Sequence, residues 1–128
     1  MLDTTFLIDS ERTGDGLDGV IEDDDDVAIA AITIAELRVG VELSKGKSRV
    51  VRHEFLEGVL TSIPVLAYDL EVAEAHAQLL VAVRRQGRPR GAHDLVIAAT
   101  ALASQRVVIT ADHPAFDDLP GVKVFIHR

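Results

Sequence analysis

Apolar runs alternate along the chain with stretches of helical spacing. Residues 27–32 form a continuous apolar run, which is typical of a strand buried on both faces of a parallel sheet. Residues 107–110 and 122–126 have the same character, and the proline-marked run 63–67 fits an edge strand. Residues 1–3 are the end of another short buried strand. The pattern therefore predicts five strands in all.

Helices are predicted between these strands. Apolar residues recur at helical spacing over residues 50–60, 69–86 and 92–103. Thr33 lies three residues before Glu36, a capping-box spacing that predicts a helix start at this point. Because strands alternate with helices, we expect an α/β protein with three α/β/α layers and a mainly parallel sheet.

The opening segment places a carboxylate in an otherwise apolar run. A charged Asp3 beside a buried strand costs several kcal/mol unless something pairs with it or ligates it, so it requires a partner elsewhere in the chain. Thr4 and Thr5 are placed to cap a helical turn over residues 6–9. Residues 12–26 are polar and broken by glycines, which predicts a loop with a short helical patch.

Length and composition restrict the class of protein. A chain of 128 residues can bury one core and is too short for two, so we expect a single domain over residues 1–128. The absence of cysteine excludes a disulfide framework, a thiolate nucleophile and a cysteine-ligated metal. No apolar run approaches the ~20 residues that span a bilayer, and no signal-peptide pattern is present. We expect a soluble, cytoplasmic protein that does not enter a membrane.

The charge is unevenly distributed. A net charge of −8 argues at first against nucleic acid as a partner. However, 10 of the 21 acidic residues lie between Asp3 and Asp26, and residues 27–128 hold 12 bases against 11 acids. The bases form two clusters that either create locally positive faces or only solvate helices: Arg38, Lys45, Lys47, Arg49 and Arg52, and then Arg84, Arg85, Arg88 and Arg90.

Four carboxylates are candidates for one site. Reactive side chains of a parallel sheet gather beyond the carboxyl ends of its strands, where Asp3, Glu36 and Asp112 are predicted to lie. Asp94 is in the first turn of the helix before the fourth strand. Four adjacent carboxylates require a cation to stay ionised, and hard oxygen ligands suit Mg²⁺ or Mn²⁺. Taken singly, each acid also has a structural explanation as a helix cap, a first-turn charge or a turn former.

Four motifs in order carry a family resemblance. They are Leu-Asp-Thr-Thr at residues 2–5, Thr-Ile-Ala-Glu-Leu-Arg-Val-Gly at 33–40, His-Asp-Leu-Val-Ile-Ala-Ala at 93–99, and Thr-Ala-Asp at 110–112 followed by Phe116. Together they resemble a PIN-domain ribonuclease, and specifically a VapC-type toxin of a bacterial toxin–antitoxin pair. Each motif alone is weak, but their order and spacing cover nearly the whole chain.

The resemblance implies a fold, an activity and a site. It implies a PIN-like sheet of strand order 3-2-1-4-5 and metal-dependent endoribonuclease activity on structured RNA. The acids Asp3, Glu36, Asp94 and Asp112 are expected to bind Mg²⁺ or Mn²⁺, with Asp3 and Asp94 as the direct ligands. A bound divalent ion activates water and polarises a phosphodiester, so no nucleophilic side chain is needed. A cognate antitoxin is the expected protein partner, and a homodimer the expected assembly.

Further residues have weaker assignments. Thr5 and Thr110 are placed to orient a metal-bound water or a phosphate, although strand-end structure explains them equally well. Asp117 is either an additional acid of the site or a turn former, and His93 and His113 flank two of the acids, with packing or surface roles favoured. The candidates for RNA phosphate contacts are Arg38, Arg84, Arg85, Arg88 and Arg90.

Two other functions compete with this interpretation. An aspartyl-phosphate phosphotransferase would use Asp3 as its nucleophile, but its pattern requires a second aspartate at position 5, where Thr5 stands. A PIN-like module that binds metal or a partner without cleaving RNA is the other alternative. The presence of all four acids weighs against such a degenerate site.

Overall fold

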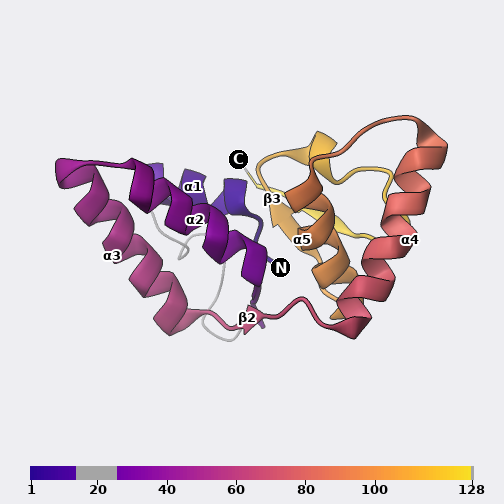
Figure 1. Cartoon of the computed structure of the whole chain (residues 1–128), viewed down its shortest axis with the longest axis horizontal. Helices are drawn as coiled ribbons and strands as arrows, with labels where there is room; N and C mark the ends of the chain where they lie inside the picture. Colours follow the sequence, from indigo (N-terminus) through magenta and orange to yellow (C-terminus); the bar gives the residue numbers. More distant parts are fainter. Residues whose placement is uncertain (14–25, 128) are drawn as a thin grey trace.

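The computed structural model describes residues 1–13 and 26–127. The elements follow the predicted alternation (Figure 1). They are α1 (Thr4–Thr13), β1 (Ile29–Ala30), α2 (Ala31–Leu43), α3 (Gly46–Ser62), β2 (Val65–Leu66), α4 (Leu70–Gln86), α5 (Ala92–Ala103), β3 (Val108–Thr110), the 3-10 helix η1 (His113–Ala115) and β4 (Val124–Ile126). Most of the loop expected over residues 12–26 lies outside the described residues.

The sheet has the expected strand order. β1 pairs in parallel with β2, and β3 pairs in parallel with β4. The opening residues lie between these two pairs, because the Leu2 amide donates to Ala28 O at 3.0 Å and Leu2 forms a parallel bridge with Ile109. In chain order this is 3-2-1-4-5, with the run 63–67 contributing the edge strand β2. The three-layer prediction is confirmed.

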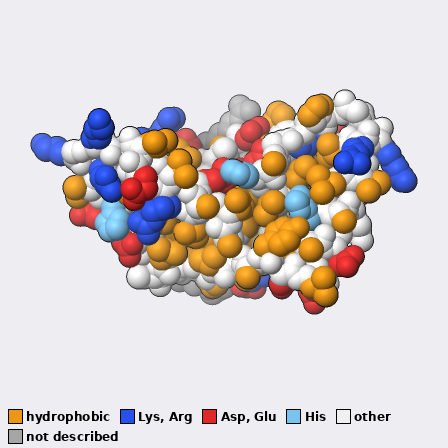
Figure 2. Space-filling view, in the orientation of Figure 1, with side chains coloured by type: hydrophobic (Ala, Val, Ile, Leu, Met, Phe, Trp, Pro, Cys, Tyr) orange, Lys and Arg blue, Asp and Glu red, His pale blue; other side chains and the backbone are white. Residues whose placement is uncertain are grey.

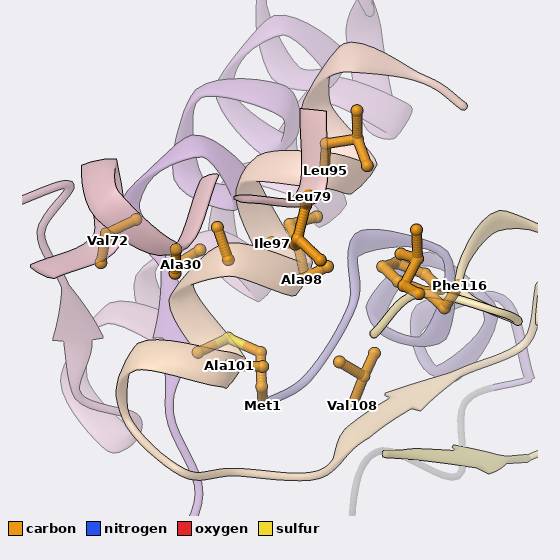
Figure 3. Packing of buried hydrophobic residues seen from close by; sticks show 13 residues of the cluster. Met1, Ala30, Val72, Leu79, Leu95, Ile97, Ala98, Ala101, Val108 and Phe116 are labelled. Atoms are coloured by element: carbon orange, nitrogen blue, oxygen red, sulfur yellow. The ribbon is translucent and has the colours of Figure 1, made fainter. Parts of the chain in front are cut away.

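Alternate residues of each strand enter two hydrophobic clusters of the one domain, one on each face of the sheet. Met1, Ala30 and Val108 join the cluster formed with α4 and α5 (Figure 3), whereas Leu2 and Ile29 join the cluster formed with α1, α2 and α3. This alternation follows from strand geometry, in which successive side chains point to opposite faces. The sheet is consequently covered on both faces, with α2 and α3 on one side and α4 and α5 on the other (Figure 1).

Two helix starts differ from the prediction. α2 begins at Ala31, and its N-cap residue Ala30 makes no side-chain capping bond, so the predicted capping box of Thr33 and Glu36 is wrong. The strand before α2 is shorter than its apolar run, because only two residues of β1 pair with β2. α1 begins at Thr4 rather than after it and continues to Thr13. The expected caps of Thr4 and Thr5 are therefore also wrong.

The long helix α4 is bounded as its sequence indicates. The side chain of Asp69 accepts a hydrogen bond from the Val72 amide, and Gly87 ends the helix in the left-handed region at φ 68°. No helix in the described part of the chain is long and apolar enough to cross a membrane.

Candidate active site

Asp3 lies where the first strand meets α1. Its amide donates to Ile109 O at 2.9 Å, and its side chain is only 1% exposed. Its Oδ1 accepts the Thr4 amide at 2.7 Å, while its Oδ2 accepts the hydroxyls of Thr5 at 2.6 Å and Thr110 at 2.7 Å. Burial raises the pKa of this carboxyl above its ordinary value, and the hydrogen bonds oppose that rise. Thr5 and Thr110 thus orient the acid itself.

Glu36 connects three helices at the same place. It is half-buried on α2, and its Oε1 accepts the hydroxyl of Thr4 at 2.7 Å. Its Oε2 lies 3.4 Å from Nδ1 of His93, at the start of α5. The hydroxyl of Thr4 also donates to that of the fully buried Thr33 at 3.2 Å. Thr4 belongs to the motif at residues 2–5 and Thr33 to the motif at 33–40. The contact between them could not be predicted without the folded structure.

Asp94 interacts electrostatically with the other three acids. It lies in the first turn of α5 and is half-buried. Burial, followed by the charges of Asp3, Asp112 and Glu36, raises the pKa of Asp94 to about 6, and His93 opposes the rise. The structure therefore brings the four acids from four separate segments into one electrostatic cluster.

Gly91 controls the space beside Asp94. A Cβ built on Gly91 would lie 2.8 Å from Oδ2 of Asp94. The backbone of Gly91 is extended, at φ −60° and ψ 140°, so other residues could adopt its conformation. A glycine before the helix start is only a weak sequence signal, and it was not among the predicted site residues.

Asp112 is connected to Asp3 through a hydroxyl. It is exposed just before η1, and its amide donates to the Thr110 hydroxyl at 2.9 Å. That hydroxyl donates in turn to Asp3, as described above. His113 is exposed beside Asp112, which fits the surface role, one of the two roles expected for it.

The donor set suits a hard divalent cation. All four acids offer carboxylate oxygens, and their mutual repulsion favours bound positive charge. Within residues 1–13 and 26–127, no three His, Asp or Glu side chains already stand in a metal-holding group. Mg²⁺ is commonly held by one or two carboxylates and several waters, and Asp3 offers one carboxylate whose direction is fixed by its hydrogen bonds.

The expected RNA-binding arginines have different surroundings. Arg84 and Arg85 are exposed in the last turn of α4, and Arg38 lies 3.8 Å from Glu57. In contrast, the side chain of Arg90 is 2% exposed and donates to the backbone of Asp117. Arg90 is too buried to contact RNA directly, so that expectation is corrected.

Asp117 is a partner of arginine. It accepts a hydrogen bond from Arg88, and this bond holds the pKa of the Asp117 carboxyl below its ordinary value.

Figure 2 shows Lys and Arg side chains at the two ends of the molecule, with acidic and histidine side chains meeting between its two halves.

The chain matches a known protein family. Residues 1–122 match the family described as PIN domain. The chain belongs to the PIN-domain family. The residues that carried the sequence resemblance are thus part of a match that spans almost the whole chain.

Several relatives of this PIN domain have descriptive names. It is 36% identical over 126 residues to the toxin FitB of Neisseria gonorrhoeae, covering 91% of this chain and 89% of that protein. It is 32% identical over 98 residues to the tRNA(fMet)-specific endonuclease VapC of Salmonella typhimurium, covering 77% and 73%. Its structure is similar, at a TM-score of 0.77 and 28% identity, to that of VapBC-5 from Mycobacterium tuberculosis, a member of the VapBC family of toxin–antitoxin systems, covering 98% and 96%.

Proposed function

We propose that this PIN domain is the toxin of a toxin–antitoxin pair and cleaves RNA by hydrolysis of a phosphodiester bond. The observation that carries the proposal is that Asp3, Glu36 and Asp112, which come from separate segments, lie close enough to Asp94 for their charges to raise its pKa. Relatives named as toxins, endonucleases and ribonucleases support it. The expected assembly into a homodimer stays a prediction.

We propose further that the four acids hold Mg²⁺ or Mn²⁺. Asp3 supplies a carboxylate whose direction is set by Thr5 and Thr110, and Asp94 supplies a second from the start of α5. A bound divalent ion would lower the pKa of a coordinated water and neutralise charge on the phosphate. Because Asp3 is 1% exposed, it suits a ligand better than the nucleophile of a phosphotransferase.

His93 is placed to hold Glu36 in position. Its Nδ1 lies 3.4 Å from Glu36 Oε2, while Glu36 Oε1 is held by Thr4. This pair holds one carboxylate in a defined direction at the edge of the cluster. The arrangement gives Glu36 a positioning or proton-accepting role beside the two direct ligands.

A groove next to the acids suits the antitoxin. A cavity of about 340 Å³ lies between α1, α2 and α3 and includes Glu36 in its lining. Leu37, Val51 and Phe55 give it apolar walls, and Arg12 stands at its side. An amphipathic segment of the antitoxin with an apolar face and a cation could therefore occupy the groove and reach Glu36.

RNA cleavage tests the proposed activity. The purified chain should cut a structured RNA with Mg²⁺ or Mn²⁺ and leave it intact in EDTA, and Asp94→Asn should abolish the cleavage. A non-catalytic PIN-like module would leave the RNA intact in all three conditions. Expression of the chain alone should arrest growth, and equal toxicity of Asp94→Asn would contradict the site assignment.

A further inference from the structure

Two arginines join the loop before α5 to the segment after Asp112. Arg88 donates through Nη2 to Pro114 O and to Oδ1 of Asp117. Arg90 donates through Nη1 to Arg88 O and through Nη2 to Asp117 O at 2.9 Å. We call Arg88, Arg90 and Asp117 the arginine latch.

A third side chain reinforces the connection. Gln86 donates through Nε2 to Asp118 O at 2.6 Å, and its Oε1 accepts a hydrogen bond from Arg90 at 3.2 Å. Nη1 of Arg88 also lies 3.7 Å from Oδ2 of Asp118. The end of α4 and the loop after it are thus fixed to the turn after η1 by side chains from both segments.

The buried side chain of Arg90 joins two segments of the chain. Its side chain is 2% exposed, and its Nε has no hydrogen-bond partner among the residues the structure describes. Burying a guanidinium is costly even when it is paired, and an apolar side chain of similar volume would often stabilise a protein as well or better. A buried charge with one unsatisfied donor is therefore better explained by the two segments that it holds together.

Both ends of the latch are close in sequence to an acid of the site. Arg90 is four residues before Asp94, and Asp117 is five residues after Asp112. Asp112 is exposed, and its amide is held only locally, by the Thr110 hydroxyl at 2.9 Å. The latch is consequently a side-chain connection between the backbone that carries Asp112 and the backbone that carries Asp94.

We propose that the arginine latch sets the separation of Asp94 and Asp112, so that both acids reach the same divalent cation. The inference rests on the proposed metal-dependent function. Arg88 and Arg90 are then positioning residues, and they do not contact the RNA. Residues that orient metal ligands typically change metal affinity by about 10- to 100-fold when they are substituted.

Manganese binding and RNA binding separate the two roles. In Arg88→Met and Asp117→Asn, the dissociation constant for Mn²⁺, measured from the electron paramagnetic resonance signal of free Mn²⁺, should rise about tenfold or more. The RNA dissociation constant in EDTA and its salt dependence should stay at the wild-type values. Excess Mn²⁺ should restore the cleavage rate. The swapped pair Arg88→Asp with Asp117→Arg should recover part of the Mn²⁺ affinity.

Two comparisons control for charge. The exposed Lys123→Gln should match the wild type in Mn²⁺ affinity. Arg84→Gln with Arg85→Gln should weaken RNA binding and reduce the slope of log affinity against log salt by about one to two, without changing Mn²⁺ affinity. The test uses Arg88 and Asp117 because their side chains are partly exposed, so that their substitution disturbs folding less than substitution of the buried Arg90 would.

The outcomes distinguish failure of the latch proposal from failure of the proposed ribonuclease function. Unchanged Mn²⁺ affinity with a reduced salt slope in Arg88→Met would make Arg88 an RNA contact and overturn the latch. A wild-type chain that binds no Mn²⁺ would also overturn it. If Mn²⁺ binding depends on the latch but RNA is never cleaved, the latch stands and the proposed ribonuclease function fails.

Discussion

Replacement of Asp94 by asparagine should stabilise the cation-free protein. The pKa of Asp94 is raised from 3.8 to about 6, chiefly by burial and then by the neighbouring acids. One pKa unit corresponds to about 1.4 kcal/mol, which sets an upper bound of about 3 kcal/mol on the cost of ionising this side chain at neutral pH. The side chain is only half-buried, so solvent screening reduces the cost to roughly 1–2 kcal/mol.

An opposing effect lowers the net gain. A negative charge in the first turn of a helix is worth about 0.3–1 kcal/mol, and Asp94→Asn loses that contribution at α5. We therefore expect a net stabilisation of about 1 kcal/mol at pH 7.5 in EDTA. For a chain of this size that corresponds to about 3–5 °C in Tm.

The pH dependence identifies the cause. The folded protein binds the Asp94 proton more tightly than the unfolded chain does, so wild-type stability falls as pH rises from about 4 to about 6 and is then constant with respect to this group. Asp94→Asn does not lose stability over this pH range. Its free energy of unfolding should therefore exceed that of the wild type at neutral pH and equal it below about pH 4. Urea unfolding followed by circular dichroism is the suitable assay, because the chain has no tryptophan.

Controls and a cation complete this test. Glu74→Gln, at an exposed position on α4, should show no comparable advantage at neutral pH. Mn²⁺ at 100 times its dissociation constant should stabilise the wild type by about 2.7 kcal/mol and reverse the order of the two proteins. A less stable Asp94→Asn in EDTA at pH 7.5, or a difference that does not change with pH, would refute the reasoning.

Three further predictions concern single positions. Gly91→Ala should change the free energy of unfolding by no more than about 0.5 kcal/mol. The new Cβ would lie 2.8 Å from Oδ2 of Asp94 and displace that side chain, so RNA cleavage should fall. The control Gly58→Ala should retain wild-type cleavage. Gly40→Leu fills open space in the wall of the cavity between α1, α2 and α3, so antitoxin binding in a pull-down should be lost while Gly58→Leu binds normally. Thr110→Val removes a donor to a buried carboxylate and should cost about 1.5–3 kcal/mol in urea unfolding, with Thr110→Ser close to the wild type.

The elements that the sequence predicted well are determined locally. The run 63–67 and helix α4 carry their own signals in a proline, in Asp69 as the N-cap and in Gly87 as the end. The start of α2 was missed because it depends on a distant partner. β1 pairs with β2 over two residues, and the helix begins directly after that pairing ends. The apolar run 27–32 contains no sign of that limit.

The site shows the same division. The four acids could be selected from strand-end positions together with the family motifs, and the structure joins them electrostatically. The partners that orient them were not predictable, since the bond from Thr4 to Glu36 requires α1 to lie against α2. Thr33 supplied a convincing capping pattern, yet it is fully buried inside the helix and accepts the Thr4 hydroxyl.

Arginine roles were the hardest to assign, because charge alone does not distinguish a ligand contact from a structural one. Arg84 and Arg90 belong to the same basic cluster in the sequence, but Arg84 is exposed while Arg90 is 2% exposed. A phosphate contact needs a guanidinium that solvent and RNA can reach, and of these two arginines Arg84 meets that condition. The decisive information is the position of Asp117, 27 residues after Arg90, whose backbone carbonyl accepts the buried guanidinium. The division of this cluster into exposed and buried arginines is thus a consequence of the fold.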